Sequence, residues 1–87
     1  GTRFTVRLGI MPDYTFSGSG VRADGIIDGK IARKAGMIAG DIITQLGDFK
    51  VTDINSYMSA LSKYKKGDSA HVITLRGKDE RTFDIVF

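Results

Sequence analysis

The chain of 87 residues has no cysteine, one histidine and one proline, and these shortages exclude several classes of function. Without cysteine, neither disulfides nor a thiolate metal site can stabilise the fold, and the redox compartment cannot be read from the sequence. A single histidine cannot build a zinc ribbon or a metalloprotease helix. A Ser-His-Asp site would need His71, which falls in a predicted strand, and no serine lies on a strained elbow turn. We therefore predict no catalytic residues, no metal and no cofactor.

Long apolar runs and concentrated charge are also missing. No segment approaches the roughly 18 to 20 apolar residues of a membrane-spanning helix, and no signal peptide precedes Phe4, so we expect no membrane contact by this domain. The 13 Lys+Arg and 10 Asp+Glu give a net charge of +3, and the basic residues are spread from Arg3 to Arg81, which disfavours a nucleic-acid partner. We expect one domain over residues 1–87, excised from a larger protein because the sequence starts abruptly.

The spacing of apolar and polar residues predicts a mainly β domain with two α-helices. Alternating residues such as Phe4, Val6 and Leu8 indicate strands with one buried face. The predicted extended segments, which amount to five or six strands, cover residues 4–8, 21–23, 25–27, 41–46, 50–51, 71–76 and 83–87. With the helices they describe a small β-sandwich or partial barrel of five to six strands capped by helices.

Two segments have the features of helices. A short helix of about one and a half turns is predicted over residues 31–35, with Gly36 ending it in a left-handed conformation. A longer helix is predicted to begin after Thr52 or Asp53, either of which can cap it, and to end at Gly67 with lysines in its last turn. Its apolar stripe consists of Ile54, Tyr57, Met58, Leu61 and Tyr64.

The tetrapeptide RLGI at residues 7–10 places a glycine between two aliphatic residues where the first predicted strand ends. Glycine accepts unusual dihedral angles, so the successive amides of Leu8, Gly9 and Ile10 can point into one concavity. Such a nest binds a carboxylate. The same pattern also occurs in ordinary turns, and the residues alone leave both interpretations open.

Longer blocks of the sequence resemble one family of binding modules. RLGI resembles the carboxylate-binding loop of PDZ domains, and GKIARKAGMIAGDIITQLGD, residues 29–48, resembles the family's short helix, A-G-x-x-x-G-D and strand. The segment ALSKYKKGDSAHVITLRGKDE, residues 60–80, is similar to the groove helix, penultimate strand and turn of bacterial PDZ modules attached to proteases. The likeness covers residues 8–87, and the whole pattern most resembles the C-terminal PDZ modules of bacterial zinc aminopeptidases.

The resemblance implies a non-catalytic module that recognises a peptide or protein C-terminus, or an extended segment, by strand addition. The loop amides would bind the terminal carboxylate, and Arg7 would strengthen this site through its charge or a bridging water. The last ligand side chain would lie against Leu8, Ile10 and Leu61, with Ile54 and Met58 lining the rest of the groove. The predicted peptide-binding residues are Arg7, Leu8, Gly9, Ile10, Met11, Ile54, Met58 and Leu61.

Two features leave alternatives open. Pro12 stands where the family donates an amide to the ligand, and proline has none, which favours a structural module that packs against its parent catalytic domain without binding peptide. A plain core role for the helix residues is the other alternative, because Tyr57, Ala60 and Tyr64 compete as the buried face. The family also often has proline where Ile31 stands, and this loss should cost little.

By resemblance, the parent protein would be a bacterial zinc peptidase that this module regulates or positions. The same resemblance implies an extracytoplasmic location, periplasmic, secreted or cell-surface. A small hydrolase in its own right is disfavoured because no paired catalytic groups are present.

Overall fold

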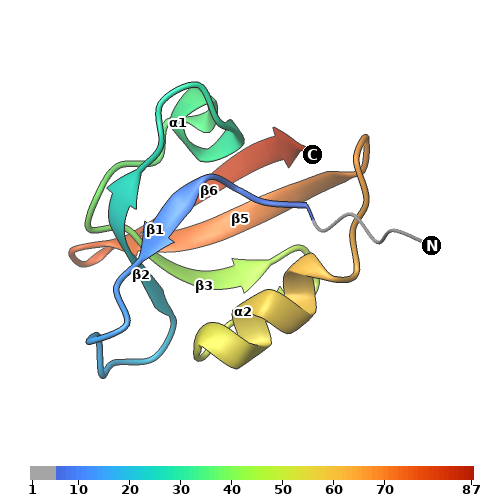
Figure 1. The fold of residues 1–87 in the computed structure, drawn as a ribbon. Helices are drawn as coiled ribbons and strands as arrows, with labels where there is room; N and C mark the ends of the chain where they lie inside the picture. The colour runs from blue at the N-terminus through green and yellow to red at the C-terminus, as the bar shows by residue number, and fades with distance from the viewer. Residues whose placement is uncertain (1–5) are drawn as a thin grey trace.

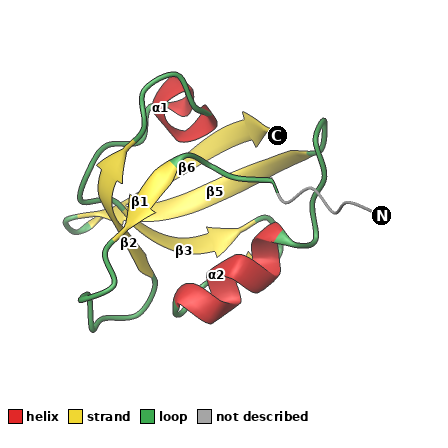
Figure 2. Cartoon of the chain, viewed as in Figure 1, coloured by secondary structure: helices red, strands yellow, loops and turns green. Residues whose placement is uncertain are grey.

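Within residues 6–87, six strands and two helices follow one another (Figure 1). The computed structural model describes residues 6–87. The elements are β1 (Ile10–Pro12), β2 (Val21–Ile26), α1 (Ile31–Ala35), β3 (Ile42–Leu46), β4 (Phe49–Lys50), α2 (Ile54–Leu61), β5 (Ser69–Arg76) and β6 (Asp79–Val86). The predicted mainly β architecture with two helices is confirmed (Figure 2).

The strands form an antiparallel sheet in the order β1-β2-β3-β5-β6, and β4 pairs with β3. The β5–β6 hairpin is the longest ladder, paired from Ser69 opposite Val86 to Arg76 opposite Asp79. The two helices lie at opposite ends of the sheet, α1 close to β6 and α2 close to β3 and β4 (Figure 1). β1 stands at one end of the strand order, so its side away from β2 is an edge.

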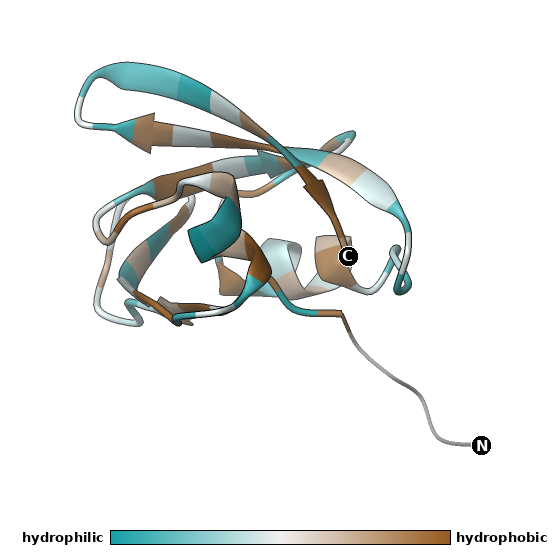
Figure 3. Cartoon of the chain, turned by 90° about the horizontal axis from the view of Figure 1, so that it is seen from above, coloured by the Kyte–Doolittle hydropathy of each residue, from teal (hydrophilic) through white to brown (hydrophobic). Residues whose placement is uncertain are grey.

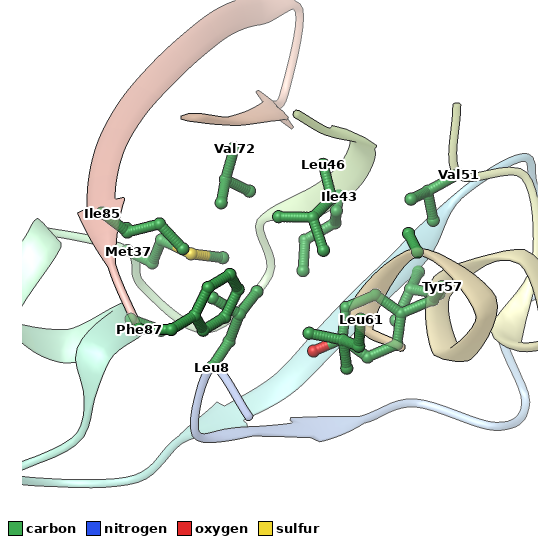
Figure 4. Close-up of a cluster of buried hydrophobic side chains, with 13 residues drawn as sticks. Leu8, Met37, Ile43, Leu46, Val51, Tyr57, Leu61, Val72, Ile85 and Phe87 are labelled. Carbon is green, nitrogen blue, oxygen red and sulfur yellow. The ribbon is translucent and has the colours of Figure 1, made fainter. Parts of the chain in front are cut away.

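Apolar side chains from the sheet and both helices meet in one core (Figure 4). Leu8, Ile43, Leu46 and Val72 are completely buried. Burying an aliphatic side chain of this size contributes about 1.5 to 3 kcal/mol, so this cluster is the main source of stability. Tyr57 and Leu61 of α2 point into the same core as Leu8, which brings the start of the chain and the helix together (Figure 4).

A partly buried ion pair fixes the turn between α1 and β3. The carboxylate of Asp41 is completely buried and accepts hydrogen bonds from Arg76 Nε at 2.8 Å, Arg76 Nη2 at 2.9 Å and the Ile38 amide at 3.0 Å. Burial acts to raise the pKa of Asp41, but the hydrogen bonds from Arg76 and Ile38 outweigh it, so the pKa lies below its ordinary value. The pair holds the turn that follows Gly36 against β5.

The boundaries of α1 agree with the prediction. Gly36 has a φ of 106°, and its amide donates to the carbonyls of Ala32 and Arg33. The start of α2 selects Asp53 over Thr52 as the cap, because the Asp53 carboxylate accepts from the Ser56 amide at 2.8 Å and the Ser56 hydroxyl accepts from the Asp53 amide at 3.0 Å.

The predicted end of the longer helix is wrong. α2 ends at Leu61 instead of reaching Gly67, so the lysines after Leu61 lie outside the helix. The amides of Lys63 and Tyr64 donate to carbonyls only three residues back, and this tighter pattern ends the helix. The turn places the centroid of the Tyr64 ring 5.3 Å from the centroid of the Phe87 ring. This tertiary packing overrides the local preference of the residues after Leu61 for a helix.

Two strand predictions also need correction. Phe4 and Thr5 of the predicted strand lie outside the described residues, and residues 6–8 are not in a strand. The Leu8 carbonyl accepts from the Ala32 amide of α1 at 2.8 Å, so this segment pairs with a helix end instead of a strand. The two short segments predicted over residues 21–27 form the single strand β2, and the return strand after β3 covers Phe49–Lys50.

Candidate functional site

The loop Leu8–Ile10 is held in place by its carbonyl groups. The Leu8 carbonyl is bound by the Ala32 amide, and the Gly9 carbonyl accepts from the Ile27 amide at 2.9 Å. Within residues 6–87, no hydrogen bond has the amide of Leu8 or Gly9 as its donor. The carbonyls fix the loop while neither amide has an acceptor within residues 6–87; Gly9 is partly exposed, whereas Leu8 is completely buried. Successive amides without an internal acceptor are the groups from which an anion-binding nest is built.

Glycine is required at position 9 for two separate reasons. Its φ of +85° lies in the left-handed region that L residues rarely adopt. A β-carbon built there would also lie 2.2 Å from Cβ of Lys30, closer than atoms can approach. The stem of Lys30 thus packs directly on the Gly9 backbone, and the loop is fixed against the segment that begins α1.

The edge of β1 next to this loop presents backbone groups to solvent. Ile10 pairs with Ile26, and the Ile27 amide binds the Gly9 carbonyl beside that pair. In an antiparallel ladder, this pattern leaves the N–H and C=O of Ile10 pointing away from β2. The first residue of the edge can therefore both donate to and accept from an added strand.

Pro12 occupies the next outward-facing position of the same edge. It pairs with Ala23, and the Asp13 amide donates to the Arg22 carbonyl at 2.8 Å beside that pair. The Pro12 carbonyl then faces the edge without an accompanying N–H. The register shifts between Met11 and Pro12, which bends the strand at this point. An added strand would lose one donor here, as the sequence predicted.

The helix residues predicted for the groove fall into two groups. Leu61 is 3% exposed and belongs to the core, together with Tyr57 and Ala60. Ile54 is half-buried, and Met58 is 50% exposed. Of the competing core residues, Tyr57 and Ala60 do form the buried face of α2, whereas the half-buried Tyr64 lies beyond the helix end.

The remaining predicted residues lie at the rim. Ile10 is half-buried and packs against the core, whereas Met11 is 52% exposed. The terminal methyl of Met11 lies against Gly25 of β2, where a β-carbon would be 2.2 Å away. Met11 therefore covers the outer face of the β1–β2 pair. Arg7 is exposed and lines a cleft together with Gly9.

A small cleft of about 160 Å³ lies at the far end of β1, opposite the Leu8–Ile10 loop. It is lined by Pro12, by Tyr14 and Phe16 of the connecting loop, and by Ile54 at the start of α2. The Gly20 amide donates to the Thr52 carbonyl at 2.9 Å and ties the end of that loop to α2. Burial raises the pKa of the Tyr57 hydroxyl, and the charge of Tyr14 in the connecting loop raises it further.

Potential metal ligands are scattered within residues 6–87. No cluster of three or more potential metal ligands occurs within residues 6–87. His71 is exposed on β5. In this same part of the chain, no helix is long and apolar enough to cross a membrane.

Sequence reasoning missed the lysines that lie beside the loop. Lys30 and Lys34 line the same cleft as Arg7 and Gly9. Their spacing of one helical turn in GKIARK was visible, but their closeness to Arg7 depends on how α1 packs against the loop.

Comparisons with solved structures identify the same fold in protease-associated proteins. An aminopeptidase N family protein from Idiomarina loihiensis superposes with a TM-score of 0.80 at 23% identity, over 91% of this chain and 13% of that chain. The HtrA-type protease AlgW, solved with a decapeptide, gives a TM-score of 0.84 at 15% identity, over 94% of this chain and 28% of that chain. The chain thus spans only a small part of these proteins.

An isolated domain gives a similar match. The PDZ domain of HtrA3, bound to the phage-derived ligand FGRWV, has a TM-score of 0.76 at 18% identity, over 92% of this chain and 82% of that chain. Among curated proteins, no sequence matches this chain. A PDZ domain family model matches residues 5–86, nearly the whole sequence. Together with the loop, the edge strand and the helix beside it, this match shows that the chain belongs to the PDZ domain family.

Proposed function

We propose that this PDZ domain binds the C-terminal carboxylate of a peptide or protein, whose last residues add as a strand to the edge of β1. The observation that supports the proposal is the pair of amides at Leu8 and Gly9, which have no acceptor within residues 6–87 although their carbonyls are anchored. A carboxylate accepting several backbone N–H bonds forms charge-assisted hydrogen bonds, about twice as strong as neutral ones.

The side chains around the loop favour an apolar last residue in the ligand. Ile10 and Leu61 belong to the core or pack against it, and neither carries a polar group. Ile54 and Met58 extend this apolar surface along α2, one helical turn apart and partly exposed. An extended peptide between β1 and α2 would place alternate side chains against them.

The similar structures support a role beside a peptidase. AlgW was solved with a decapeptide, and the PDZ domain of HtrA3 was solved with the ligand FGRWV. The protein from Idiomarina loihiensis belongs to the aminopeptidase N family. We propose that this domain regulates or positions a parent bacterial peptidase outside the cytoplasm. Peptidase activity of the full-length protein with and without the domain tests the first part, and cell fractionation tests the second.

A structural role is the second candidate, and Pro12 favours it. The missing donor at the second edge position and the aromatic loop at the far end both weaken a peptide ladder. In that case the domain would pack against its parent catalytic domain without binding a peptide C-terminus.

A titration followed by amide-resolved NMR separates the two candidates. A peptide with an apolar last residue should shift the signals of Leu8, Gly9 and Ile10 and those of residues 54–61. The same peptide with an amidated C-terminus should lose most of this response, because the nest requires the negative charge. Equal responses to the acid and the amide would contradict carboxylate recognition, and no response to either would favour the structural role.

A further inference from the structure

We propose a second anion-binding site next to the carboxylate loop, in the cleft between that loop and α1, which takes an acidic side chain of a partner protein. The cleft has a volume of about 430 Å³ and is lined by Arg7, Gly9, Ile27, Gly29, Lys30, Ile31 and Lys34. The proposal extends the proposed function to a neighbouring surface and does not require a terminal carboxylate.

Three cationic side chains in this cleft form no ion pair within residues 6–87. Arg7, Lys30 and Lys34 all line it. The ion pairs within residues 6–87 join Arg22 to Asp13 and Asp24, Arg33 to Asp28, and Arg76 to Asp41, and none uses a cation of the cleft. Residues 1–5 contain no Asp or Glu, so they supply no side-chain carboxylate either. The cleft is thus a site of uncompensated positive charge.

The nearest acidic groups do not neutralise it. Asp28 lies in the turn before α1, but its carboxylate is 3.4 Å from Nε of Arg33. Asp84 shares a separate hollow with Lys34 and forms no ion pair with it among residues 6–87. α1 shows hydrophilic residues on its outward turn when the molecule is seen from above (Figure 3). The cations of the cleft therefore form no ion pair with an acidic side chain among residues 6–87.

The floor of the cleft suits an amino-acid side chain. Ile27 and Ile31 are apolar and partly exposed, and no atom lies within 4 Å of the position of a β-carbon at Gly29. The methylene groups of a glutamate can lie on this floor while its carboxylate reaches the lysines. Neither an aromatic ring for base stacking nor an extended basic stripe is present in the lining, which disfavours a nucleic-acid strand.

The test uses an N-acetylated and C-amidated peptide of alternating Glu and Ala, with a matched peptide in which Gln replaces Glu. In an NMR titration of the whole chain in about 0.1 M salt, the Glu peptide should shift the amides of residues 27–34, and the Gln peptide should not. The double variant Lys30→Gln, Lys34→Gln should weaken Glu-peptide binding by about three- to tenfold, as expected for losing two exposed ion pairs. It keeps the Cβ and Cγ atoms that pack on Gly9.

A control variant removes the same charge elsewhere. Lys50→Gln, Lys78→Gln changes exposed lysines on β4 and in the β5–β6 turn, and neither lines the cleft. It should change the affinity for the Glu peptide by no more than about twofold, because about 0.1 M salt largely screens charges that lie more than about 10 Å apart. Equal losses in both variants, or equal binding of the Glu and Gln peptides, would overturn the proposal.

Two further arms identify the source of the anion. Tighter binding of a short oligonucleotide, or of vesicles containing phosphatidylglycerol, at residues 27–34 would overturn the acidic-peptide proposal in favour of phosphate. The capped peptide has no terminal carboxylate, so its failure to bind leaves carboxylate recognition at Leu8–Ile10 unaffected. Conversely, a response confined to residues 27–34 would uphold this site even where an apolar C-terminal peptide fails to bind.

Discussion

The two ends of the β1 edge differ in how completely they are prepared for a ligand. At the Leu8–Ile10 end, two carbonyls are anchored at 2.8 and 2.9 Å, and the amides beside them remain without acceptors within residues 6–87. At the far end, Pro12 offers a carbonyl but no N–H, and Tyr14 and Phe16 line a small cleft with Ile54. A ligand would gain most of its backbone hydrogen bonds from the first end.

This difference indicates where affinity and selectivity arise. The loop at the carboxylate end is already fixed by its carbonyls, so a ligand carboxylate can bind there without the cost of ordering the loop. This end should therefore dominate the affinity. The far end can contribute the Pro12 carbonyl and side chains, but no backbone donor at that position. Substitutions can disturb the frame that both ends share, which includes the Asp41–Arg76 ion pair, or either end by itself.

The largest expected effect is on the frame. Arg76→Met removes the partner of the completely buried Asp41 and should lower the free energy of unfolding by about 3 to 5 kcal/mol, measured by urea denaturation. Peptide contacts at the carboxylate end and at the far end should weaken to the same extent. A folded variant that loses peptide contacts at only one of the two ends would contradict a shared frame.

The same variant has a pH signature. The Asp41 pKa lies below its usual value in the folded protein, so the pair stabilises the wild type above about pH 4 and less as the pH falls. In Arg76→Met, the Ile38 amide and the charge of Arg81 still lower the Asp41 pKa, but the larger contribution of Arg76 is gone, so burial raises this pKa above that of the wild type. The difference in stability between wild type and variant should therefore shrink as the pH falls below about 4. A pH-independent difference would exclude the ion pair as its cause.

Leu61→Ala disturbs the carboxylate end through the core. Leu61 is 3% exposed, and its truncation should cost about 2 to 5 kcal/mol of stability and weaken peptide binding. Met58→Ala is the matched control on the same helix, since Met58 is 50% exposed and should cost only about 0.5 kcal/mol or less. Calorimetry with an apolar-ended peptide gives the binding part. Equal stability losses would mean that the two side chains do not differ in burial as described.

Gly9→Val disturbs the carboxylate loop itself. The left-handed φ of +85° and the contact with Lys30 should cost about 1 to 3 kcal/mol of stability, and binding of a terminal carboxylate should fall more than stability does. Gly67→Val is the control, because Gly67 has a φ of +95° with no atom within 4 Å of its β-carbon position. The control should lose stability and keep binding. If the Gly9→Val protein binds the terminal carboxylate normally, RLGI is an ordinary turn and not a carboxylate-binding loop.

The smallest effect is expected at the far end. Pro12→Val restores one ladder hydrogen bond, worth about 0.5 to 1.5 kcal/mol, and should tighten peptide binding by about two- to tenfold. If proline instead protects the edge of β1 from unwanted pairing, the variant should self-associate. Calorimetry together with analytical ultracentrifugation distinguishes these results. Unchanged affinity in a folded monomer would remove Pro12 as the cause of weak binding.

The sequence alone determined the features that depend on neighbouring residues. Gly36 ends α1, a cap at Thr52 or Asp53 begins α2, and the alternation in residues 71–87 forms the β5–β6 hairpin; the structure then selects Asp53 as the cap. Each follows from a rule of backbone conformation or local hydrogen bonding that acts over a few residues. The glycine of RLGI belongs to the same class, because its positive φ needs no distant partner to be predicted.

Only the tertiary structure decided the features that depend on contacts between distant segments. Asp41 and Arg76 are 35 positions apart, and nothing local marks them as partners. The early end of α2 follows from packing Tyr64 on Phe87, and the loss of a strand at residues 6–8 follows from pairing Leu8 with α1. Arg7 meets Lys30 and Lys34 in one cleft for the same reason. Local preferences amount to tenths of a kcal/mol per residue, whereas burying a large side chain contributes about 1.5 to 3 kcal/mol, so packing decides wherever the two conflict.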